Sequence, residues 1–158
     1  MAIARGYRFD IPFDQAFPQG LVMVGEVTAD TEYQSREDRA AGRPTRQRVD
    51  EVTGKRQWKV MVTDPDELKA KRASFEVILL ADHQPVPTGP EVLPGMRPVE
   101  LDGLTAEPKV AGQGEYKYQS YAFRATGFKE AATGSGSGSK SAGRSGSAAS
   151  GDAAGKAA

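Results

Sequence analysis

Cysteine is missing from this chain of 158 residues, which excludes disulfide bonds, a thiolate nucleophile and any cysteine metal site. No apolar run approaches the roughly 20 residues that cross a bilayer. The N-terminal sequence MAIARGYRFD also lacks the continuous apolar stretch of a signal peptide. We therefore expect a soluble, cytoplasmic domain that makes no membrane contact and is stabilised by its apolar core alone.

Groups that carry catalysis are also scarce. His83 is the single histidine, and the proline-rich sequence around it offers no catalytic partner, so we expect it on the surface. The chain has no G-x-S-x-G elbow, no Walker A loop and no G-x-G-x-x-G fingerprint. Asp64, Asp66 and Glu67 lack EF-hand spacing and fit the start of a helix. We expect neither an enzyme nor a protein that binds a metal or cofactor.

The chain instead contains a series of short alternating segments. Residues rich in β-branched and aromatic side chains recur in five stretches, at 20–33, 55–63, 74–81, 96–110 and 115–129. The stretch 74–81, SFEVILLA, is apolar on both faces and is expected to be the central strand. The pattern predicts an all-β fold, a five-stranded antiparallel barrel spanning residues 20–130.

Glycine and aromatic residues predict further details of these strands. Gly25 is expected to allow a bulge in the first strand, and Gly103 is expected to break the fourth. In the last strand, Tyr121 and Phe123 are expected to point into the core, because Tyr116 and Tyr118 alternate away from them. The barrel is thus predicted to have an aromatic side chain on both faces of its last strand.

The connections carry signals of their own. Asp64 followed by Pro65 predicts one short connecting helix over residues 65–72, the only helix expected. Four prolines in residues 82–95 predict an extended crossover. Residues 34–54 have breakers and no sustained period, which favours a mobile binding loop.

The two ends of the chain differ from the predicted barrel. Residues 1–19 alternate aromatic and polar positions and are expected to form an extended arm, which packs on its own barrel or on a second subunit. The second alternative favours a homodimer. Residues 131–158 are rich in Gly, Ser and Ala and are expected to be a disordered tail.

Charge is segregated along the chain although the net charge is zero. Residues 36–59 contain eight Lys or Arg against four Asp or Glu, and the tail contains three basic residues and one acid, so residues 1–130 contain 21 − 3 = 18 basic and 21 − 1 = 20 acidic residues. Any attraction to nucleic acid must therefore come from a local basic patch.

Several segments resemble a known family. Residues 94–110, PGMRPVELDGLTAEPKV, followed by 121–128, YAFRATGF, are similar to the fourth and fifth strands of small OB-fold proteins. The pattern DEVTG-x3-W-x-V-x-V-x-D from Asp50 to Asp64 resembles single-stranded-DNA-binding proteins of the filamentous-phage gene V type, and OB-like proteins of mobile elements in high-GC bacteria. The resemblance implies an OB-like barrel that coats single-stranded DNA in phage or plasmid replication or transfer.

Single-strand binding requires cations for the phosphates and aromatic faces for the bases. We therefore predict a nucleic-acid interface made of Arg43, Arg46, Arg48, Lys55, Arg56, Trp58, Lys59, Tyr116, Lys117, Tyr118 and Arg124. The ligand expected is single-stranded DNA of any sequence, and the pattern does not distinguish DNA from RNA.

Interpretations that assign these residues no role in binding stay open. The basic loop could be only a solvated surface, and a lone tryptophan such as Trp58 more often packs than binds. The rival function is a protein-interaction or structural module of a mobile element that does not bind nucleic acid, which the slight acidity of residues 1–130 favours.

Overall fold

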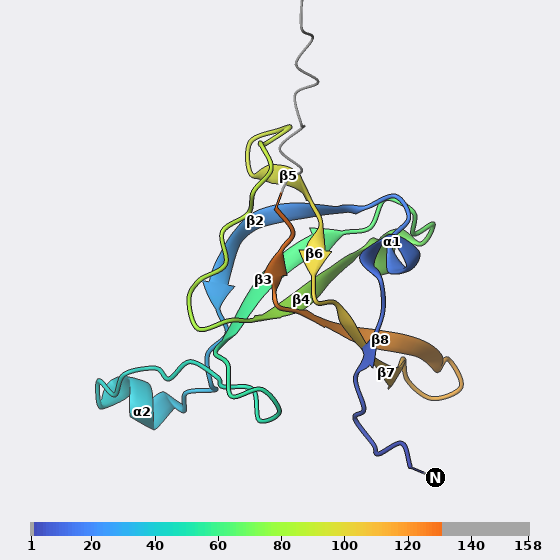
Figure 1. Ribbon diagram of the computed structural model, residues 1–158. Helices are drawn as coiled ribbons and strands as arrows, with labels where there is room; N and C mark the ends of the chain where they lie inside the picture. Colours follow the sequence, from blue (N-terminus) through green and yellow to red (C-terminus); the bar gives the residue numbers. More distant parts are fainter. Residues whose placement is uncertain (1, 131–158) are drawn as a thin grey trace, which may run out of the picture.

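The computed structural model describes residues 2–130, so the predicted tail at 131–158 lies outside the described part of the chain. Strands dominate (Figure 1), which confirms the prediction of a mostly β fold. The strands are β1 (Phe9–Asp10), β2 (Leu21–Ala29), β3 (Gln57–Thr63), β4 (Ser74–Leu80), β5 (Met96–Val99), β6 (Leu101–Asp102), β7 (Thr105–Ala111), β8 (Tyr118–Ala125) and β9 (Gly127–Phe128), and the helices are α1 (Phe13–Ala16), α2 (Arg36–Ala40) and α3 (Ala70–Ala73).

The predicted five-stranded, antiparallel barrel is wrong in its strand number, its pairing and its closure. Seven strands form one mixed sheet in the order β1-β7-β8-β4-β3-β2-β5, which does not close into a barrel. β4 and β8 run parallel, with Ile78 opposite Arg124 and Leu79 opposite Ala125. β6 and β9 pair separately.

The single strand predicted at 96–110 is divided into three, which explains much of this difference. Gly103 has φ 61, a left-handed conformation that favours glycine, and the chain turns there between β6 and β7. β5 pairs with β2, whereas β7 pairs with β8 and β1. One stretch of sequence therefore supplies strands near both ends of the sheet.

The middle of the sheet follows the sequence closely. β4 has three strands on each side, as expected for the most apolar segment. The predicted bulge is confirmed, because the register of β2 against β3 shifts between Val24 and Thr28, around Gly25. Val62 of β3 with Val77 and Leu79 of β4 are fully buried in the core.

The N-terminal residues pack against the same sheet. Phe9 of β1 pairs with Ala106, and Ile11 N donates to Leu104 O. After α1, Phe17 is buried against Phe75 and Phe123, with ring centroids 5.8 and 5.0 Å away. The aromatic arm therefore lies on its own sheet, the first of the two expected alternatives.

The prediction of a single helix over residues 65–72 is wrong. α3 begins only at Ala70, and two further short helices are present among residues 2–130. Asp64 does not cap a helix, because its Oδ1 accepts the Asp66 N–H at 2.9 Å and closes a local turn. No helix in the described part of the chain is long and apolar enough to cross a membrane.

Candidate nucleic-acid interface

The loop between β2 and β3 continues the sheet beyond its regular strands. Arg48 N donates to Asp30 O at 2.8 Å, and Gln57 N donates to Arg48 O at 2.9 Å. The segment around Arg48 therefore runs between the end of β2 and the start of β3. The sequence predicts an irregular loop here, and the structure instead shows two ordered parts. We name them the α2 lobe, residues 33–45, and the tip hairpin, residues 49–56.

The α2 lobe is ordered by polar contacts and contains no buried residue within α2. Ser35 caps the helix, since its Oγ accepts the Asp38 N–H at 3.0 Å. Asp38 also binds Arg43 at 2.9 Å, and the Gln34 amide donates to the Arg43 carbonyl. The lobe projects away from the sheet (Figure 1), and Tyr33 at its start is 84% exposed.

The tip hairpin is held by a buried ion pair. Arg8 donates from both terminal nitrogens to the Asp50 carboxylate, at 2.9 and 2.6 Å, and Asp50 is only 1% exposed. The Thr53 N–H and hydroxyl also donate to Asp50, at 3.0 and 2.8 Å. The hydrogen bonds from Arg8 lower the pKa of Asp50 to about 2, against the opposing effect of burial. The N-terminal segment thereby fixes the position of the tip hairpin.

Four of the predicted cations already have acidic partners. The pairs are Arg43 with Asp38 at 2.9 Å, Arg48 with Asp30 at 4.0 Å, Lys55 with Asp82 at 2.7 Å and Arg124 with Glu107 at 2.7 Å. The hydrogen bond from Arg124 also lowers the pKa of Glu107. Their charges are therefore largely neutralised within the protein.

The other four predicted cations are Arg46, Arg56, Lys59 and Lys117, and none forms an ion pair within residues 2–130. Arg46 and Arg56 are exposed in the loop, Lys59 is half-buried on β3, and Lys117 is exposed before β8. We refer to these residues as the four unpaired cations. They are the predicted site residues best able to attract phosphate.

The sheet register places two predicted residues on one face. Lys59 lies opposite Ile78, and Ile78 lies opposite Arg124, so the two cations share a row two strands apart. Strand spacing puts their backbones about 10 Å from each other. We call the sheet surface that carries this row the outer face, because Val60 and Val62 of β3 point to the core on the opposite side.

The predicted site residues do not all come together. Tyr118 begins β8, six residues before Arg124, which corresponds to about 20 Å along a strand. Tyr116 and Lys117 lie beyond it, in the connection between β7 and β8. The candidate interface therefore has two ends, the β2–β3 loop and the β7–β8 turn, joined by the outer face.

The predicted aromatics have different environments. Trp58 is half-buried against the core, and its indole N–H donates to the Ala81 carbonyl at 2.9 Å, so packing accounts for it. The Arg72 guanidinium lies 3.6 Å from the centroid of the Tyr118 ring and covers one face of it. Tyr116 is 86% exposed. The expectation that Tyr121 belongs to the core is wrong, because it is 47% exposed opposite Pro108.

The β7–β8 end also contains residues that the sequence did not single out. A groove of about 800 Å³ is lined by Arg5 and Lys109 together with Lys117 and Tyr118. Arg5 precedes the first strand by several residues, so its proximity follows only from the pairing of β1 with β7. No local sequence signal indicates it.

No cluster of His, Asp or Glu suited to holding a metal ion occurs in residues 2–130, and His83 is exposed. Comparisons with protein families, with characterised proteins and with solved structures find no match to this chain.

Proposed function

We propose that this protein binds single-stranded nucleic acid without sequence preference and without catalysing a reaction. The observation that carries the proposal is the placement of the four unpaired cations: Lys59 on the outer face, Arg46 and Arg56 at one end, and Lys117 at the other. A strand laid along this face would meet positive charge at both ends and on the face between them. Coating of single-stranded DNA during replication or transfer of a phage or plasmid is the process that we infer.

The connectivity supports an OB-like interpretation of the sheet. The order β2-β3-β4-β8-β7 combines an antiparallel meander with a parallel return strand. OB folds bind oligonucleotides across the second and third strands and through the loops between strands one and two and between strands four and five. The β2–β3 loop and the β7–β8 turn would occupy these two loop positions here.

The salt dependence of binding tests the proposal. Each phosphate contact on a single strand contributes about 0.7 to the slope of log K against log salt. Replacing all four unpaired cations with alanine, as Arg46→Ala, Arg56→Ala, Lys59→Ala and Lys117→Ala, is expected to flatten this slope by roughly 3 and to weaken binding to every sequence alike. The measurement is fluorescence anisotropy of a labelled oligothymidine at several salt concentrations, with a duplex and an RNA of equal length in parallel.

The control variant removes the same number of charges from residues that already have acidic partners: Arg43, Lys55, Arg97 and Lys129. Its net charge equals that of the first variant, so a general effect of charge would appear in both. We expect its slope to change by less than about 1. Wild-type affinity and slope in the first variant would exclude the proposal and leave the protein-interaction module as the better interpretation.

Tyr118 supplies a second test, of base stacking. Arg72 covers one face of its ring, which leaves the other face for a base. Tyr118→Ala is expected to weaken oligothymidine binding by about 1–3 kcal/mol with little change in the salt slope. Tyr121→Ala is the control, because Tyr121 is also exposed but points to the opposite side of β8. Equal losses in the two variants would contradict a specific role for Tyr118.

A further inference from the structure

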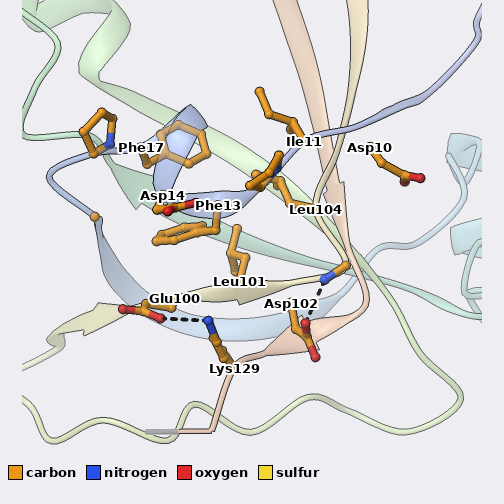
Figure 2. Close-up of a pocket in the computed structure, with 14 residues that line it drawn as sticks. Asp10, Ile11, Phe13, Asp14, Phe17, Glu100, Leu101, Asp102, Leu104 and Lys129 are labelled. Carbon is orange, nitrogen blue, oxygen red and sulfur yellow. Dashed lines mark hydrogen bonds and ion pairs between the residues drawn. The ribbon is translucent and has the colours of Figure 1, made fainter. Parts of the chain in front are cut away.

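A second site lies between α1 and β6. The cavity of about 640 Å³ is walled by apolar side chains, among them Ile11, Phe13, Leu101 and Leu104 (Figure 2). Phe13 is half-buried on the core and closes one side. We call this cavity the α1 pocket. It is large enough to receive an apolar side chain of the size of one aromatic ring.

The rim of the α1 pocket is acidic. Asp10, Asp14, Glu100 and Asp102 line it, against Lys129 as the one cation of the lining. Lys129 lies 3.8 Å from Glu100 (Figure 2), whereas Asp10 and Asp14 form no ion pair within residues 2–130. An apolar cavity with uncompensated carboxylates favours an occupant that joins an apolar or aromatic group to positive charge.

The α2 lobe has this combination. Tyr33 is the lobe's exposed aromatic side chain, and Arg36 and Arg39 are exposed without an ion pair in the described part of the chain. The two arginines are three residues apart and share one face of α2. Because the lobe is held by its own hydrogen bonds, it presents these side chains on an ordered protrusion.

The lobe cannot reach the pocket of its own chain. α1 and α2 lie on opposite sides of the sheet structure in Figure 1. We propose that the α2 lobe of one copy docks into the α1 pocket of a second copy, with Tyr33 in the cavity and Arg36 and Arg39 against Asp10 and Asp14. Different surfaces then meet in each contact, so the contact is heterologous and can repeat into open chains of molecules.

This inference does not depend on nucleic-acid binding. The docking residues differ from the four unpaired cations, and the association can be measured with the protein alone. We expect the weight-average mass of the full chain, measured by sedimentation velocity, to rise with concentration up to several hundred micromolar. Raising the salt concentration from 0.1 to 0.5 M is expected to weaken association, since charge attraction is screened.

Two variants separate the two halves of the contact. The lobe variant carries Tyr33→Ser, Arg36→Ser and Arg39→Ser, and the pocket variant carries Asp10→Lys and Asp14→Lys. All five side chains are exposed, so the fold should persist, and circular dichroism checks this. Each variant alone is expected to remain monomeric where the wild type associates, a loss in affinity of at least tenfold.

The decisive measurement is an equimolar mixture of the two variants. The lobe variant retains an intact pocket and the pocket variant retains an intact lobe, so the mixture is expected to form dimers and to stop there. A wild-type protein that stays monomeric at every concentration would overturn the proposal, as would a folded variant that associates like the wild type. A mixture that stays monomeric, or one that grows beyond dimers, would also overturn it.

Discussion

Arg8→Ala is expected to lower the free energy of unfolding by about 3–5 kcal/mol, the usual cost of leaving a buried charge without its partner. Asp50 is only 1% exposed and receives two hydrogen bonds from Arg8. After the substitution only Thr53 would donate side-chain or backbone hydrogen bonds to this carboxylate. Urea denaturation followed by the fluorescence of Trp58 measures the change.

The matched control is Arg43→Ala, which breaks an exposed pair with Asp38 at 2.9 Å in the same loop. Exposed pairs contribute about 0–1 kcal/mol, so this variant should remain close to the wild type. Equal stabilities of the Arg8 and Arg43 variants would show that the tip hairpin does not depend on the N-terminal segment.

The same ion pair predicts a pH dependence. Asp50 has its pKa lowered from 3.8 to about 2 in the folded state, so the folded protein keeps this carboxylate ionised more readily than the unfolded chain. The stabilisation is complete above about pH 4 and is lost as the pH falls towards 2, by about 2 kcal/mol in total. The Arg8→Ala variant should show a smaller decline, because the hydrogen bonds from Arg8 are the largest of the effects that lower the pKa of Asp50.

Phe17→Ala is expected to cost about 3–5 kcal/mol, the range for a buried phenylalanine. Phe17 contacts three other aromatic rings, with centroids 5.0 to 5.8 Å away, from Phe13, Phe75 and Phe123. A loss of this size is a large fraction of the 5–15 kcal/mol that stabilises a typical domain. Thermal and urea unfolding of the variant measure it.

Phe9→Ala is the control for that substitution, because Phe9 lies in the same N-terminal segment but is exposed at the edge of the sheet. It is expected to cost less than half as much. If Phe17→Ala were as mild as Phe9→Ala, the N-terminal residues would be an accessory to the fold and not a part of its core.

Local patterns were sufficient to predict the central strands but not which strands they pair with. The alternation of Trp58, Val60 and Val62 predicts β3, and the apolar run from Ser74 to Ala81 predicts the central strand. The parallel pairing of Leu79 with Ala125 joins residues far apart in sequence, and no periodicity encodes it. The helix expected after Asp64 failed because a local turn used the same carboxylate.

The sequence was sufficient to predict the basic composition of the candidate site, but not which of its basic residues form ion pairs. Sequence shows that residues 36–59 are rich in basic side chains, but it cannot show that Lys55 lies 2.7 Å from Asp82 while Lys59 has no such partner in the described part of the chain. The Arg8–Asp50 pair was missed for the same reason, since its members are 42 positions apart. The one local signal near this pair was the combination of Asp50 with Thr53 and Gly54, which is typical of a turn but says nothing about Arg8.

The parallel pairing of β4 with β8 has a consequence for synthesis. Val77 and Leu79 emerge from the ribosome well before the residues of β8, so the most apolar strand has a free edge while the chain grows. At 5–20 residues per second, this interval is on the order of seconds. An apolar edge left open for that time is a surface for aggregation, and newly made chains of this protein are therefore expected to depend on chaperones more than the finished fold does.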